Sequence, residues 1–107
     1  MSDLALIAGL PEVRSAVLGD LAGGFFDAVR EPDGETVAVV MGFLATAVVQ
    51  AGEHLGLGAL RRATVSGPTR AHLVVLHGSS VMTACVEPAA AVAAVEKALD
   101  AALTGRG

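Results

Sequence analysis

Residues 37–49 read VAVVMGFLATAVV, and every position except Gly42 and Thr46 is apolar. The segment from 35 to about 55 contains no proline and has the length of a helix, which Asp33 can cap at its N-terminus. A helix that is apolar nearly all round must be covered on two sides. One side can pack on the domain's own sheet, so the sequence predicts that a partner covers the other. The apolar run of thirteen residues is shorter than the roughly 20 needed to cross a bilayer, so we expect no membrane span.

The chain before this helix predicts a short helix and a β-hairpin. Residues 3–10 favour a helix that Gly9 and Pro11 end, and residues 13–18 and 24–30 read as strands. Between the strands, residues 20–23 (DLAG) are typical of a tight turn, because glycine accepts the positive φ that such turns need.

After the long helix, the sequence LGLG at residues 55–58 predicts a glycine C-cap. Turn residues then separate three predicted strands, at 62–66, 71–77 and 81–87. We expect Pro88 to be the first residue of a last helix. That helix has one apolar stripe, formed by Val92, Val95, Leu99 and Leu103. Because nearly all connections between strands are hairpins, the expected fold is α/β (α+β), with a mainly antiparallel sheet and one domain over residues 1–107.

The amino-acid composition excludes some classes of function. The chain has a net charge of −4, a single lysine (Lys97), and neither Trp nor Tyr. Nucleic-acid binding needs clustered cations and aromatic rings for base stacking, so it is not expected. One cysteine, Cys85, cannot form an internal disulfide, and no signal peptide is apparent at the N-terminus. These features favour the cytoplasm.

No catalytic, metal or cofactor site is expected. A phosphate-binding loop needs a lysine in a glycine-rich turn, and Lys97 is far from Gly23 and Gly24 in sequence. His72 and His77 are five apart on one predicted strand and should face opposite sides, while His54 suits a helix C-terminus. Cys85 lies in an apolar strand, away from the open, electropositive setting of a reactive thiol, although Ser79 and Ser80 are close in sequence.

Taken in order, these elements resemble the Roadblock family, the group of dynein light chains and bacterial GTPase regulators. The resemblance rests on Leu10-Pro11-Glu12-Val13, the Asp20-x-x-Gly23 hairpin, the long apolar helix, LGLGAL at 55–60 before the strand ATVSGP at 63–68, and Glu87-Pro88 before the last helix. It covers about residues 4 to 103. The resemblance implies a profilin-like sandwich, in which a five-stranded antiparallel sheet has the long helix on one face and both terminal helices on the other.

The resemblance also implies a homodimer, formed by the long helices at 35–55 and the edge strands at 63–67. The residues expected at the dimer interface are Val40, Phe43, Leu44, Val48, Ala63, Thr64 and Val65. Family members bind Ras-like small GTPases, either stimulating hydrolysis or acting as scaffolds, so a GTPase and other Roadblock-type proteins are the expected partners. The residues expected to contact a partner are Gln50, Glu53, Arg61 and Arg62.

Two further interpretations stay open. Arg61 and Arg62 can instead protect an exposed strand from aggregation, since charges near a sheet edge deter pairing with other chains. As a whole, the chain can also be a small-molecule-binding regulatory domain without catalytic activity. That alternative needs polar groups that converge among apolar walls, and the sequence alone shows no such cluster.

Overall fold

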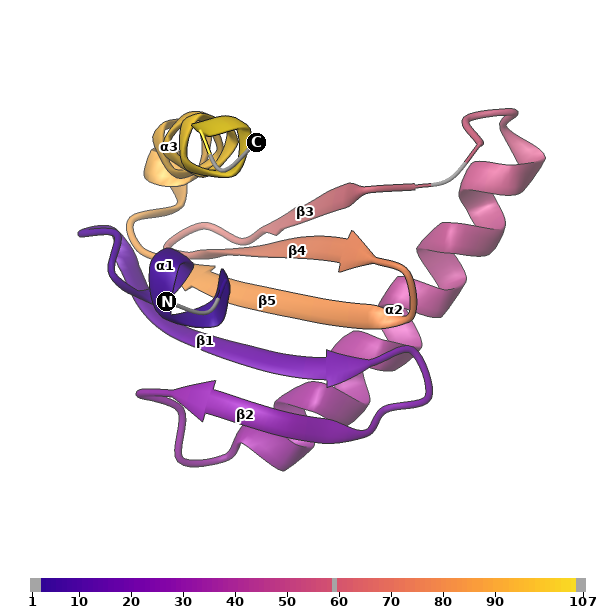
Figure 1. Ribbon diagram of the computed structural model, residues 1–107, viewed down its shortest axis with the longest axis horizontal. Coiled ribbons are helices and arrows are strands. Elements are labelled where there is room, and N and C mark those ends of the chain that lie inside the picture. Colours follow the sequence, from indigo (N-terminus) through magenta and orange to yellow (C-terminus); the bar gives the residue numbers. More distant parts are fainter. Residues whose placement is uncertain (1–2, 59, 106–107) are drawn as a thin grey trace.

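The computed structural model describes residues 3–58 and 60–105, so Ala59 of the LGLGAL motif lies outside it, as does the N-terminal dipeptide (Figure 1). A short α1 precedes two strands, the long α2, three more strands, a 3₁₀ turn and α3. Their bounds are α1 Asp3–Ala8, β1 Val13–Asp20, β2 Phe25–Val29, α2 Gly34–His54, β3 Arg62–Ser66, β4 Ala71–His77, β5 Ser80–Val86, the 3₁₀ turn Ala89–Ala91 and α3 Val92–Gly105. The predicted order is therefore confirmed, and β3 and β4 have the predicted bounds.

The five strands form one sheet in the order β2-β1-β5-β4-β3, and every neighbouring pair is antiparallel. Consecutive strands pair in the two hairpins β1–β2 and β4–β5 and in β3–β4, whereas β1 pairs with β5 across the middle of the sheet. β2 and β3 are consequently the two edge strands.

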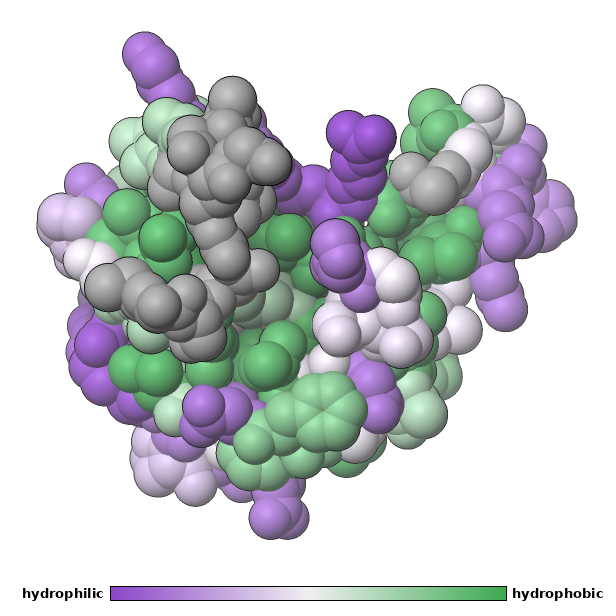
Figure 2. Space-filling model, in the orientation of Figure 1, coloured by the Kyte–Doolittle hydropathy of each residue, from purple (hydrophilic) through white to green (hydrophobic). Residues whose placement is uncertain are grey.

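Each face of the sheet has its own hydrophobic core. On one face, Leu4 and Ile7 of α1 and Val95 and Leu99 of α3 pack over Leu73 and its neighbours. On the other face, Met41 and Ala45 of α2 pack over Val74, Leu76 and Val81. The predicted layers are confirmed. Figure 2 is a space-filling view in the orientation of Figure 1. Apolar residues are visible in it between the terminal segments and the C-terminal end of α2.

Small residues let α2 lie close to the sheet. The helix buries Ala38, Gly42 and Ala45 against β1 and its neighbours, and Gly52 further along. A Cβ atom on Gly42 would lie 2.9 Å from the carbonyl oxygen of Asp20 and 2.9 Å from the amide nitrogen of Gly23. Only a glycine allows the helix to touch the backbone of the β1–β2 turn at this point.

The two ends of α2 differ from one another in how they are capped. Asp33 is the N-cap residue, as predicted, but its side chain makes no capping hydrogen bond and only its carbonyl accepts, from the amide of Val37. At the C-terminus, Gly56 has a φ of +73°, the amide of Leu57 donates to Gly52, and the amide of Gly56 donates to Glu53. This pair of bonds is the Schellman motif, so the predicted glycine C-cap is confirmed.

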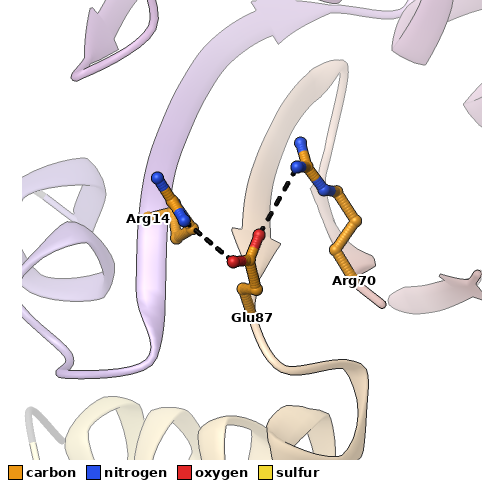
Figure 3. Close-up of polar contacts among 3 residues, drawn as sticks. All are labelled: Arg14, Arg70 and Glu87. Atoms are coloured by element: carbon orange, nitrogen blue, oxygen red, sulfur yellow. Dashed lines mark hydrogen bonds and ion pairs between the residues drawn. The ribbon is translucent and has the colours of Figure 1, made fainter. Parts of the chain in front are cut away.

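Pro88 does not open the last helix, and that prediction is wrong. The Glu87–Pro88 peptide bond is cis, Pro88 is extended (φ −74°, ψ 162°), and the 3₁₀ turn lies between it and α3. The extended backbone continues past β5 because the amide of Glu87 donates to the carbonyl of Glu12. The Glu87 carboxylate also lies between two guanidinium groups, 2.8 Å from Arg14 Nη1 and 3.5 Å from Arg70 Nη2 (Figure 3).

Candidate protein-interaction surface

Helix α2 exposes large apolar side chains on the side away from the sheet. Val39, Val40 and Phe43 are 58%, 56% and 80% exposed, and Ala47 continues the stripe one turn later. We call these four residues the apolar face of α2. Monomeric soluble proteins seldom expose contiguous apolar patches of this kind, and such patches mark sites of interaction.

Two leucines extend the exposed apolar surface beyond the helix. Leu55 and Leu57 are 73% and 62% exposed, at the end of α2 that projects past the β3 edge of the sheet (Figure 1). In a Schellman motif the residue at the position of Leu57 often packs on the one at the position of Gly52. Since Gly52 has no side chain, Leu57 has nothing to pack on there.

The edge strand β3 presents different residues to the two faces of the sheet. Ala63 packs with the α2-side core, and Val65, two residues on, is 46% exposed. Thr64 points the other way, and its hydroxyl donates to the Glu96 carboxylate of α3 at 2.8 Å. Only Ala63 and Val65 therefore share a side with α2.

The structure separates the predicted interface residues into exposed and packed ones. Val40, Phe43 and Val65 are exposed, whereas Leu44 and Val48 are half-buried and Leu44 packs on the α2-side core. Sequence reasoning missed Val39 and Ala47, and it missed the exposed Phe25 and Phe26 on edge strand β2. The spacing of the small residues 38, 42 and 45 was the available signal, because it marks the buried side of α2 and hence the exposed one.

The four residues predicted to contact a partner do not form one site. Gln50 lies on α2 and lines a shallow groove with Val39 and Phe43, while Glu53 is exposed further along the helix. Arg61 and Arg62 instead line a separate hollow on the α3 side of the sheet.

The turn after β1 is a structural turn. The Asp20 carboxylate accepts hydrogen bonds from the amides of Ala22 (2.9 Å) and Gly24 (2.8 Å), and Gly23 has a φ of +88°. A phosphate-binding loop directs such amides at the phosphate. Here they already bind an acidic side chain of the protein.

His72, His77 and Cys85 lie on strands β4 and β5, apart from the apolar face of α2. His72 pairs with Cys85 and His77 with Ser80, on opposite faces of β4. Burial, and secondarily Arg70, lower the pKa of His72, which Glu31 partly opposes. Cys85 is buried, as predicted. Within residues 3–58 and 60–105, no three His, Cys, Asp or Glu side chains are grouped to hold a metal ion.

Helix α2 is long and apolar enough to cross a membrane, judged by length and composition alone. It has 21 residues, and its mean hydropathy is 1.5 over an 18-residue window. The apolar run of thirteen residues is thus only part of a longer apolar helix, and the expectation of no membrane span stays a prediction. Core helices of soluble proteins pass the same test, and the small residues of α2 pack on the sheet.

Comparison with solved structures identifies the fold. A Roadblock/LC7 domain from Streptomyces avermitilis superposes with a TM-score of 0.72 at 22% identity, over 94% of this chain and 92% of that one. The Roadblock/LC7 fold is the fold of this chain. MglB from Myxococcus xanthus superposes with a TM-score of 0.75 at 14% identity, over 89% and 84% of the two chains. The gliding protein MglB from Thermus thermophilus gives 0.68 at 16% identity, over 91% and 82%. No model of a known protein family and no curated protein matches the sequence.

Proposed function

We propose that this Roadblock-fold chain is a cytoplasmic homodimer that binds a Ras-like small GTPase, as a regulator or a scaffold, without catalytic activity of its own. The observation that carries the proposal is the apolar face of α2, where Phe43 is 80% exposed beside two half-exposed valines. A second copy of the same helix would cover this face, because a two-fold interface pairs a patch with itself.

The edge strand supports the same arrangement. β3 pairs with β4 on one side only, and Val65 lies exposed on the α2 side of the sheet. Two copies of β3 can pair edge to edge while their α2 helices pack together, which would satisfy backbone groups that an edge leaves open. One of the similar solved structures is described as MglB with a tetrameric arrangement, so self-association occurs within this fold.

The GTPase part of the proposal rests on the family resemblance of the sequence and on the fold shared with MglB. A homodimer would place two copies of Gln50 and Glu53 beside the paired helices, on a surface with few charges. Interface cores in other proteins are likewise depleted in charged residues.

Binding to the Ras-like GTPase encoded nearest the gene tests this part. The affinity is measured by calorimetry with the GTPase loaded with GDP and then with a non-hydrolysable GTP analogue. A ligand with equal affinity for both states cannot shift a two-state switch, so a regulator must prefer one state. A tenfold preference, about 1.4 kcal/mol, identifies a regulator. Equal binding identifies a scaffold, and no binding of any GTPase from the same cell refutes the GTPase role.

A further inference from the structure

Edge strand β2 exposes two aromatic side chains beside an open sheet edge. Phe25 is 40% exposed and Phe26 is 59% exposed. Among the described strands, β2 pairs with β1 alone, so its other edge is open (Figure 1). An open edge presents unpaired backbone N–H and C=O groups, onto which another strand can pair. β2 therefore offers both backbone groups and apolar side chains to a partner, at the edge of the sheet opposite β3.

The negative charge of the chain is concentrated around this edge. Residues 20–35 include β2, the turn before it and the connection to α2. They contain five of the eleven acidic residues and a single cation, Arg30, which gives this segment the same formal charge of −4 as the whole chain. The acidic residues of the segment are Asp20, Asp27, Glu31, Asp33 and Glu35. The Arg30 guanidinium is held by three backbone carbonyls of α1 and β1. The β2 edge is thus acidic, and a cationic partner complements it.

The strand register places an aromatic and an acidic side chain of β2 on different faces of the sheet. Phe25 pairs with Gly19, and its ring lies against Gly34 of α2, where a Cβ atom would come within 2.7 Å of a ring carbon. Phe25 therefore lies on the α2 side. Asp27 pairs with Leu18, which packs on the core beneath the terminal helices. A strand added to this edge would meet an aromatic ring on one face and a carboxylate on the other.

The Asp27 side chain also shields the backbone of the open edge. Alternate residues of an edge strand direct their backbone groups away from the paired strand. Ala28 is one of these, because its amide donates to the Asp27 carboxylate at 2.8 Å. A cation on an incoming strand would attract this carboxylate and leave the amide of Ala28 free to bond to the new strand. A neutral or acidic strand has no such attraction, so Asp27 makes the edge selective for basic segments.

We propose that the β2 edge binds an extended basic segment of a partner protein by strand addition. Cations on one face of the segment lie beside Asp27, and large apolar side chains on the other face pack on Phe25. Backbone hydrogen bonds give such complexes affinity, and alternate side chains give them specificity. The β2 edge of a second copy carries the same charge of −4 and is repelled. The inference does not depend on the proposed dimer, which uses β3 and α2.

Titration of the full chain with three synthetic peptides tests the proposal. The peptide KVKFKVK, with blocked termini, alternates lysines with apolar residues. EVEFEVE has the opposite charge, and KKKKVVF has the same composition as the first peptide without its alternation. KVKFKVK should bind saturably by calorimetry and more weakly as salt is added, because salt screens exposed charges. EVEFEVE and KKKKVVF should each bind at least tenfold more weakly. The absence of saturable binding, or equal binding of KVKFKVK and KKKKVVF, would overturn the proposal.

Hydrogen exchange of the backbone amides shows which edge the peptide occupies. The amide of Ala28 should become protected when KVKFKVK binds, while the amides of Thr64 and Val65 on β3 should not change. Protection at β3 in place of β2 would contradict the proposal. Protection of Ala28 in the free protein that appears only at high concentration would show that a second copy occupies the edge, and the proposal would then be wrong.

Two matched variants test the role of the Asp27 carboxylate. Asp27→Asn removes the charge and keeps a side-chain oxygen for the amide of Ala28, whereas Glu53→Gln removes an exposed charge near the C-terminal end of α2. Asp27→Asn should weaken KVKFKVK binding at least fivefold, and Glu53→Gln should leave it unchanged. Equal loss in both variants would mean that only the net charge attracts the peptide, which would refute binding at this edge. Both side chains are exposed, so both variants should fold, which their thermal unfolding checks.

Discussion

Thr64 of β3 donates a hydrogen bond of 2.8 Å to the Glu96 carboxylate of α3. One turn later on α3, the Asp100 carboxylate accepts from Arg62, two residues earlier on the same strand. The edge strand is thus bonded to the last helix at two positions, on the face opposite α2. Helix α3 therefore positions both the edge on which a second copy would pair and the β3 side of the hollow.

The ion pair between Arg62 and Asp100 should make stability fall in acid. The hydrogen bond from Arg62 is the main cause that lowers the pKa of Asp100. A lowered folded-state pKa stabilises the protein above the ordinary aspartate pKa of about 3.9, and this stability is lost as pH falls through the folded-state pKa. Urea unfolding of wild type and Asp100→Asn should differ at pH 7 and converge below pH 4. If wild type and Asp100→Asn still differ in unfolding free energy in acid, the Asp100 side chain acts through packing alone.

His72 should produce a second pH dependence at higher pH. Burial, and secondarily Arg70, lower its pKa in the folded protein, so the unfolded chain takes up the proton first. Stability is full above the ordinary histidine pKa of about 6.5 and falls as pH drops through that value, until folded His72 is itself protonated. The Nδ1 atom is buried without a hydrogen-bond partner in the described residues, which fits this resistance to protonation. His72→Asn should flatten the urea midpoint between pH 7 and 5. If the urea midpoint of the variant still changes with pH as in wild type, groups other than His72 cause the pH dependence.

Most of the fold could be predicted from the sequence, because local signals and the fold agree. Alternating strands, turn glycines and one long apolar segment fix the element order, and the short connections force antiparallel pairing. The start of the last helix was predicted one step too early, since Glu87 is still bonded to the backbone of Glu12 and Pro88 precedes the 3₁₀ turn. Arg30 is another such case. It has a φ of +57°, and its guanidinium donates to the carbonyls of Ala8, Val13 and Arg14.

The interaction surface could be predicted only in part. Composition indicates that α2 must be buried on two sides. Its apolar residues surround the helix, however, and do not show which side packs on the sheet. The side is determined by which residues are small enough to approach the β1–β2 turn, and that depends on the position of Gly42 over Asp20. The hollow beside Arg62 was beyond sequence reasoning altogether, because Leu18, Val75 and Asp100 come from distant parts of the chain.

Two glycines of α2 should respond in opposite ways to alanine. In Gly42→Ala the new methyl would meet backbone atoms at 2.9 Å, so the variant should lose about 1–3 kcal/mol of unfolding free energy, as overpacked sites do. In Gly52→Ala the nearest atoms belong to Leu60 at 3.8 Å, an ordinary contact, so the better helix propensity should stabilise by about 0.5–1 kcal/mol. Chemical denaturation of both variants measures the difference. Equal effects would mean that α2 does not contact the turn as closely as described.

Phe43→Glu should abolish the proposed dimer without harming the monomer. Phe43 is 80% exposed, so its removal costs little packing within one chain. Between two α2 helices the new carboxylate would be buried without a partner, which costs about 3–5 kcal/mol. Light scattering should give twice the 10.6 kDa chain mass for wild type and the single mass for the variant. Ala94→Glu, which adds the same charge to an exposed position of α3, should stay dimeric. A wild-type monomer at high concentration, or a Phe43→Glu dimer as tight as wild type, would exclude the apolar face of α2 as the interface.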